Sequence, residues 1–402
     1  MKKGWYILLI VLLSLGLAAC NQDEEEKETA DENKVEKTEE SASKDENQAD
    51  DEVYSTKNVT RLNVENIVDA AIMTSRTIWP ATIEENKPKT VILVPTDNWQ
   101  IALASADMIH HPTNGPVLFY DQDQISDETV KEIERLAPLG GSDGTEVMLM
   151  GEPNQKIVDQ LKDYSVQQVK GSDPAEFAAK IDEVYAEAAG ELPNSIIIVS
   201  AEEEAKLYSL IAANWISHMS EPILYITKDG IPEATREAIN KRNNKANLYI
   251  LGPEEAISSE IEDSLKEFGT VTRIEGNTAV ETSIAFAKFK DEQTGFGWGV
   301  NEPGIGLVFT STEKPEYAIT AAPFAHLGKH APLIWLENGE LANETHVFLA
   351  DRQPTFIDDP TVGPYNHAYI IGSGESITME TQGMIDQMLE IVSEGGGGHA
   401  GH

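Results

Sequence analysis

Short apolar runs alternate with helix-spaced segments along most of the chain. In the first part, continuous apolar runs at 91–94, 117–120 and 147–150 predict strands, and the segments between and around them predict helices at 64–78, 99–109, 127–136 and 153–164. Strands that are buried on both faces appear in the sequence as continuous apolar runs. Helices that connect consecutive strands are typical of parallel sheets. The pattern therefore predicts an α/β fold.

The same pattern occurs three times in one phase. The second copy predicts strands at 196–199, 223–226 and 248–251 with helices at 174–189, 204–218, 232–241 and 256–268; the third predicts strands at 307–309, 333–336 and 369–371 with helices at 279–289, 317–327 and 378–392. Pro116, Pro222 and Pro332 precede equivalent strands and follow one another at nearly equal steps. This period fits whole small domains. We therefore expect three tandem, doubly wound, Rossmann-like units with parallel sheets. Segment 341–365 is richer in Pro and Asp and predicts no clear helix.

The N-terminal segment 1–20 has the pattern of an export signal. Lys2 and Lys3 precede an apolar run at 7–17, too short to span a bilayer comfortably, and Leu17-Ala18-Ala19-Cys20 follows. Small residues before a cysteine resemble a bacterial lipoprotein signal, in which Cys20 becomes the lipidated first residue. An ordinary signal peptide with a chance cysteine is the alternative. Cys20 is the only cysteine, so we expect no disulfide in the exported part.

Residues 21–56 predict a disordered acidic tether. Between Asn21 and Glu52 there are 15 acidic and 4 basic residues, a net charge of −11. Such a segment cannot bury enough apolar surface to offset its ordering entropy. Removing this segment and the two signal lysines from the formal charge of −39 leaves −30 on the remainder. This charge excludes nucleic acid as a partner and argues against electrostatic adhesion to anionic lipid.

Three short motifs recur in each unit. An opening element is represented by Arg61 and Arg273, with Gln168 at the corresponding place in the second unit. A helix rich in small residues follows, as in Ala104-Ser105-Ala106 and Ala321-Ala322-Pro323. One strand of each unit then begins with proline, and a later strand ends at Gly151, Gly252 or Gly372. In order and spacing the chain resembles the cell wall-binding repeat type 2 family of Gram-positive surface proteins. The resemblance divides the chain into units at 57–170, 171–270 and 271–392, before a Gly/His tail at 393–402.

The resemblance carries further implications. It implies that the units pack about a pseudo-threefold axis, and that they bind cell-wall glycopolymer noncovalently, either an anionic polymer or a peptidoglycan-associated glycan. With Cys20 and the tether, it implies a lipoprotein on the extracytoplasmic face of the membrane.

Aromatic residues on the proline strands are the first candidates for a binding surface. Phe119, Tyr225 and Trp335 occupy the same position in each unit, toward the carboxyl ends of strands, where open α/β sheets bind ligands. Aromatic rings offer rigid apolar faces on which sugars can stack. The alternative is packing within or between units. The full set of ligand-binding candidates is Pro116, Phe119, Pro222, Tyr225, Pro332, Trp335, Arg61 and Arg273.

No catalytic set stands out in the sequence. The histidines are scattered and the only cysteine is the lipidation candidate, so we expect neither enzymatic activity nor a cofactor or metal. The favoured interpretation is a non-enzymatic, membrane-anchored envelope lipoprotein that binds wall glycopolymer or organises the zone between wall and membrane. A solute-binding lipoprotein of a transporter and a divergent cell-wall hydrolase are the alternatives. A solute-binding protein needs two lobes and one cleft, which the triple pattern disfavours.

Replacing the only cysteine tests the anchor. The Cys20→Ala variant should appear in the culture medium, because its mature chain lacks the thiol to which lipid is attached. Fractionation of cells and medium, followed by detergent phase partition, measures the change. Retention in the membrane fraction with unchanged detergent behaviour would mean that the anchor lies elsewhere.

Overall fold

The computed structural model describes residues 53–327 and 330–395, all of which fall within the unit Ala49–His402. Cys20, the acidic segment up to residue 52 and most of the Gly/His tail lie outside the described residues. Within the described ranges, no helix combines the length and apolar character needed to cross a membrane.

The first sheet is parallel, with strand order β4-β3-β5-β6. Its elements are β3 (Val91–Pro95), β4 (Val117–Tyr120), β5 (Val147–Met150), β6 (Val166–Val169), α1 (Ile67–Ile78), α2 (Trp99–Ser105), α3 (Asp127–Leu136) and α4 (Gln155–Gln160), with 3-10 turns η1 (Glu84–Asn86) and η2 (Ala106–Met108). Asn98 and Ser126 cap α2 and α3 by accepting hydrogen bonds from backbone N–H groups in the first turn. The predicted elements are present, and β6 is an additional strand.

The second sheet repeats this arrangement in the order β8-β7-β9-β10. Its elements are β7 (Ser195–Ser200), β8 (Ile223–Ile226), β9 (Ala246–Leu251), β10 (Gly269–Ile274), α5 (Pro174–Ala189), η3 (Glu203–Ala205), α6 (Lys206–Leu210), α7 (Ala212–Ile216), α8 (Glu233–Asn240) and α9 (Ser259–Leu265). The long helix predicted at 204–218 is therefore divided into three short helical segments.

The third sheet has the order β12-β11-β14-β2-β1, and only β1 is antiparallel to its neighbour. Its elements are β1 (Val53–Ser55), β2 (Val59–Leu62), β11 (Gly306–Ser311), β12 (Leu333–Leu336), β14 (His367–Ile371), α10 (Ala279–Lys288), α11 (Tyr317–Ala321), α12 (Phe324–Leu327), α13 (Asn343–Ala350) and α14 (Met379–Leu389). Between them lie β13 (Thr355–Phe356), η4 (Pro360–Val362) and β15 (Val392–Ser393), and β13 pairs with β15. A helix, α13, does occur in the segment for which none was predicted.

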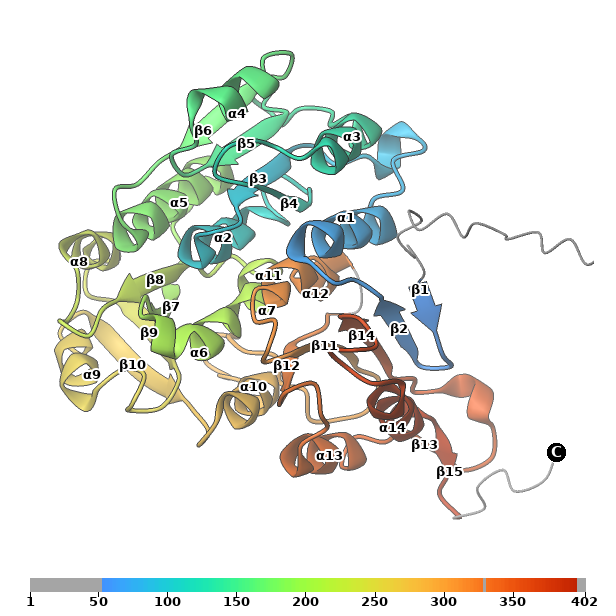
Figure 1. Cartoon of the computed structure of the whole chain (residues 1–402). Coiled ribbons are helices and arrows are strands. Elements are labelled where there is room, and N and C mark those ends of the chain that lie inside the picture. The colour runs from blue at the N-terminus through green and yellow to red at the C-terminus, as the bar shows by residue number, and fades with distance from the viewer. Residues whose placement is uncertain (1–52, 328–329, 396–402) are drawn as a thin grey trace, which may run out of the picture. The chain divides into compact units, whose positions relative to one another are not determined.

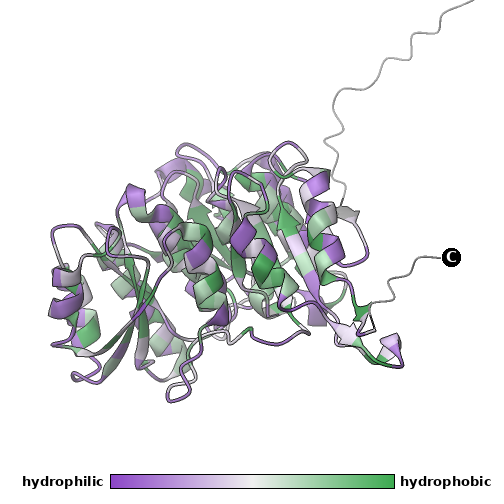
Figure 2. Cartoon of the chain, turned by 90° about the horizontal axis from the view of Figure 1, so that it is seen from below, coloured by the Kyte–Doolittle hydropathy of each residue, from purple (hydrophilic) through white to green (hydrophobic). Residues whose placement is uncertain are grey.

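The three sheets share one strand order: proline strand, first strand, glycine-ended strand and a fourth strand that contains Gln168, Arg273 or Arg61. These small parallel sheets with flanking helices confirm the predicted α/β class. Their arrangement about a threefold axis remains a prediction. The apolar strands are green between more polar, purple helix faces and loops in Figure 2.

The fourth strands group the chain differently from the expected unit ranges. Strand β2, expected to open the first unit, pairs with β14 of the third sheet, with Val59 beside Ala368 and Leu62 beside Ile371. Figure 1 shows this N-terminal strand in blue among the orange and red strands of the C-terminal part. The expected boundary between 270 and 271 falls inside β10. Strand β2 therefore completes the third sheet, although the helix that follows it in the chain, α1, belongs to the first unit.

The helix after each of these strands packs on the next sheet. Helix α1 contacts β4, α5 contacts β8, and α10 contacts β12. Each strand–helix connection therefore crosses from one sheet to another. As a result, the three units interlock, and the N-terminal strand closes the series by joining the first unit to the third.

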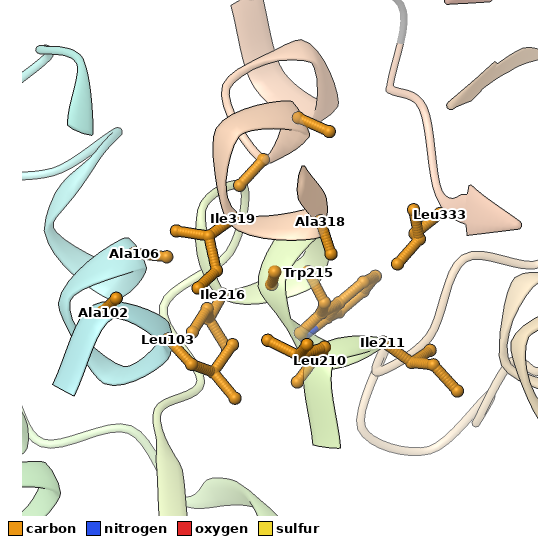
Figure 3. Packing of buried hydrophobic residues seen from close by; sticks show 14 of the residues in the cluster. Ala102, Leu103, Ala106, Leu210, Ile211, Trp215, Ile216, Ala318, Ile319 and Leu333 are labelled. Atoms are coloured by element: carbon orange, nitrogen blue, oxygen red, sulfur yellow. The ribbon is translucent and has the colours of Figure 1, made fainter. Parts of the chain in front are cut away.

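Small side chains lie where the helices of different units meet. Figure 3 shows Ala102 and Ala106 of the first unit, Ile216 of the second and Ile319 of the third around one packed region. All four side chains are buried. Helices α7 and α11 contact one another, and α7 also contacts α2 and η2. Alanine lets helix backbones approach closely in a core packed at the density of organic crystals.

Arg61 holds the closing strand in place from inside the protein. Its side chain is fully buried; Nε donates to Gln382 Oε1 at 2.6 Å, Nη1 to Gly372 O at 3.2 Å and Nη2 to Thr378 O at 3.3 Å. All three acceptors are uncharged, and desolvation lowers the pKa of Arg61 to about 10. Nearby, the Asp386 carboxylate accepts from Thr56 Oγ1 and from the Asn58 backbone N–H, each at 2.7 Å.

Replacing Arg61 by Met should destabilise the protein by about 2–4 kcal/mol, because three buried acceptors lose a charged donor. Urea unfolding measures this change. Arg273→Met is the matched control, since Arg273 occupies the corresponding position in β10 but is only partly buried. An equal or smaller loss at Arg61 than at Arg273 would contradict the proposed importance of the closing strand.

Candidate functional site

The proline-strand aromatics are buried, and two of them contact a neighbouring unit. Phe119 is 1% exposed, and Tyr225 and Trp335 are fully buried. Tyr225 Oη donates to Gln100 O in α2 of the first unit at 2.8 Å, and its ring meets Trp99 edge to face. Trp335 Nε1 donates to Leu207 O in α6 of the second unit at 3.0 Å. These contacts correspond to the packing alternative, and the burial leaves no ring face on which a sugar could stack.

The three prolines are also buried and act through their backbone. The carbonyls of Pro116 and Pro222 accept from Ile92 N and Ile197 N at 2.9 Å, and Pro332 O accepts from Val308 N at 3.0 Å. Proline lacks an N–H group, so it fits the first position of a strand, where that donor is not needed. These residues set the register of strand pairing.

The opening residues bind the chain itself. Arg61 donates to Gly372 O, Gln168 Nε2 to Gly151 O at 3.1 Å, and Arg273 Nη1 to Gly252 O at 2.8 Å. Each therefore ties a fourth strand to the carbonyl of the glycine that ends the neighbouring strand. Arg273 also pairs with Glu262 at 2.7 Å. The eight sequence candidates do not converge on one open surface.

Two pockets lie at corresponding junctions between consecutive units. One, with a volume of about 220 Å³, is lined by residues that include Pro112, Thr113 and Glu187. The other, of about 380 Å³, is lined by residues that include His218 and Met219. Pro112 and His218 are separated by the same number of residues as Pro116 and Pro222, so they occupy corresponding positions in the two units. Both pockets lie by segments that lead into the amino ends of the strands, opposite the edge that the sequence favoured.

A loop of the third unit builds the larger pocket. Residues 289–305 join α10 to β11, and Phe296 anchors them by stacking on Tyr249 of the second unit with ring centroids 3.7 Å apart. Phe296 is fully buried. Gly297 has a φ of +96°, and a Cβ there would lie 2.5 Å from Phe289 O, so this position requires glycine. The loop is therefore held by close packing at Phe296 and Gly297.

This loop places Trp298 at the pocket beside residues of the second unit. Trp298 is half-buried; its ring is parallel to His218 with centroids 5.6 Å apart and perpendicular to Trp215 at 5.0 Å. His330 Nδ1 and His218 Nε2 share a hydrogen bond of 3.2 Å. We refer to the cavity lined by Trp215, His218, Trp298, Lys290, Glu302 and His330 as the junction pocket.

The charged groups of the junction pocket are of both signs. Lys290 Nζ donates to Gly295 O at 2.6 Å and to Gly297 O at 3.0 Å, so part of its donor capacity stabilises the loop. Glu302 provides a carboxylate. Behind the pocket, Trp215 Nε1 donates to Glu221 at 3.0 Å, and burial raises the pKa of Glu221. Among the described residues, no group of three or more His, Cys, Asp or Glu could hold a metal ion.

Sequence reasoning did not select the junction pocket. The glycines at 295–299 are noticeable in the sequence, but they lack the strand–helix context of a phosphate loop. The signal that could have identified the site is the alternation of aromatic residues with glycine in Gly295-Phe296-Gly297-Trp298-Gly299, which occurs in one unit alone.

Comparison with solved structures identifies similar folds. Cwp6 from Clostridium difficile superposes with a TM-score of 0.67 at 18% identity, covering 83% of this chain and 48% of Cwp6. Cwp8 from Clostridium difficile gives 0.64 at 18% identity, with coverages of 83% and 52%. The chain therefore spans about half the length of each. No protein-family model matches it, and no curated protein matches its sequence.

Replacing Tyr225 by Phe tests the packing role of the proline-strand aromatics. The variant should lose about 1–2 kcal/mol of stability, because Gln100 O loses its buried donor while the ring remains. Phe119 shows that this chain accommodates phenylalanine at the corresponding position. Urea unfolding measures the loss, with Tyr365→Phe as an exposed control. Unchanged stability would contradict a structural role for the hydroxyl group.

Proposed function

We propose that this protein is a non-enzymatic component of a bacterial cell envelope that binds wall glycopolymer through its three interlocked units. The observation that carries the proposal is the threefold recurrence of one sheet topology, together with its similarity to Cwp6 and Cwp8, which are cell wall proteins. The recurrent Arg, Ala and Pro motifs support membership of the cell wall-binding repeat type 2 family.

The chemistry of the junction pocket supports binding rather than catalysis. Among the described residues that line this pocket there is no serine, threonine or cysteine that could act as a nucleophile. The pocket instead combines indole and imidazole rings with polar groups, as small-molecule binding sites do.

The lipoprotein-like signal before Cys20 and the acidic tether after it support a location close to the membrane. Residues 20–52 would anchor the units by lipid at Cys20 and extend at most roughly 110–120 Å at about 3.3–3.6 Å per residue. With a formal charge of −30, the remainder of the chain would be repelled by anionic wall polymer unless salt screens the repulsion. Binding to walls that retain such polymer should therefore strengthen as salt rises.

Co-sedimentation with purified Gram-positive walls tests this proposal. Residues 49–402 should sediment with intact walls, and the bound fraction should rise between low and moderate salt as the Debye length falls from about 30 to about 8 Å. Walls stripped of anionic polymer distinguish the two ligand classes: retained binding indicates peptidoglycan-associated glycan, and lost binding indicates the anionic polymer.

Two outcomes would overturn the proposal. Absence of sedimentation at every salt concentration would exclude wall binding. Lysis of the same walls in a zymogram would replace the binding role with a hydrolase. Bovine serum albumin, also acidic, serves as the control for nonspecific trapping.

A further inference from the structure

We propose that the junction pocket binds an uncharged sugar ring, with Trp298 as the stacking residue. The inference deepens the proposed function, since it would assign the units a defined glycan subsite. It depends on the geometry of one loop and can be tested with free sugars, independently of wall binding.

The loop that carries Trp298 is the longest of the three corresponding connections. The helix-to-strand connection covers 289–305 in the third unit, 79–90 in the first and only 190–194 in the second. No residue of the longest connection belongs to a sheet. Ordering a backbone costs about 1–2 kcal/mol per residue, so this loop needs its own compensating contacts. Phe296 supplies these contacts by packing against Tyr249, Phe286 and Trp215.

The anchoring of Phe296 fixes the position of the nearby Trp298. Phe296 is buried, and Trp298 is half-buried at the pocket. Gly297 lies between them and Gly299 follows, and both adopt positive φ angles that favour glycine. The ring of Trp298 is further held by His218 and Trp215. Such preorganisation reduces the entropy lost when a ligand binds. His218 covers one face of the ring, so a ligand in the pocket would meet the part of Trp298 that stays exposed there.

Size and polarity favour a sugar as the ligand. The volume of about 380 Å³ is in the range of small-molecule sites, about 300–1,000 Å³. A pyranose ring has an apolar C–H face that can pack on indole and a rim of hydroxyl groups that need donors and acceptors. His218, His330, Lys290 and Glu302 provide both kinds of group around Trp298.

Charge favours an uncharged ring over an acidic one. Lys290 and Glu302 are opposite in sign, and Lys290 already donates to two loop carbonyls. The two histidines share a hydrogen bond with each other. The formal charge of −30 outside the signal and acidic tether adds a field that repels anions. A neutral hexopyranose or N-acetylhexosamine unit therefore fits better than a uronic acid or a sugar phosphate.

The experiment is calorimetric titration of the full-length protein with three trisaccharides: tri-N-acetylchitotriose, maltotriose and trigalacturonic acid. At least one neutral sugar should bind with a Kd below about 10 mM, with little dependence on salt. Trp298→Ala should weaken binding at least about tenfold, and Trp298→Phe should weaken it less. Tyr365→Ala, an exposed aromatic residue of the third unit outside this pocket, should leave binding unchanged.

Each contrary result overturns the inference. These results are no binding of either neutral sugar, unchanged affinity in folded Trp298→Ala, and tighter, salt-sensitive binding of the anionic trisaccharide. If Trp298→Ala does not fold, Trp298→Phe and Glu302→Gln decide the question, since Phe keeps an aromatic ring at 298, Gln keeps the shape of the Glu302 side chain, and both should alter neutral-sugar affinity. Wall co-sedimentation that persists in a folded Trp298→Ala variant lacking sugar binding would separate the two proposals, leaving wall binding to another surface.

Discussion

The close approach of helices from different units is the constraint on which the architecture depends. Ala102, Ala106 and Ala318 are buried where α2, η2, α7 and α11 gather, and larger side chains there would separate the sheets. Such separation would break the hydrogen bonds that cross between units, including Tyr225 to Gln100 and Trp335 to Leu207. It would also widen the junctions that form both pockets. The fold and the two junction pockets therefore depend on the same small residues.

Periodicity predicted most of the sheet but not its fourth strands. Strands such as β3 and β7 are buried along their whole length and read as continuous apolar runs. Strands β2, β6 and β10 have mixed sequences, VTRL, VQQV and GTVTRI, because their polar residues bind glycine carbonyls inside the fold. From the sequence alone, an arginine side chain is expected to be exposed, because the buried groups that accept its hydrogen bonds are not known. Those acceptors, at Gly372 and Thr378, lie near the opposite end of the chain from Arg61, beyond any local pattern.

The candidate site shows a related limit of repeat-based reasoning. Comparing three copies selects positions that they share, and Phe119, Tyr225 and Trp335 share a buried position in the packed interior. Trp298 has no counterpart in the repeated pattern, so the same comparison passes over it. Residues common to all units indicate the fold here, whereas the candidate pocket depends on the longest helix-to-strand connection, 289–305. The position of this loop beside His218 depends on tertiary packing that sequence spacing does not reveal.

The pairing of β2 with β14 determines the order in which the three sheets can fold. Strand β2 is synthesised early, but Ala368, the partner of Val59, belongs to the last part of the chain. The first and second sheets draw all their strands from nearby segments and can form before the chain is complete. The third sheet cannot form until almost the whole chain is present. Until then, the edge of β2 that pairs with β14 keeps unpaired backbone N–H and C=O groups. A chain cut before residue 367 would lack the strand that receives β2, so an incomplete chain would keep an open sheet edge that proteases can recognise.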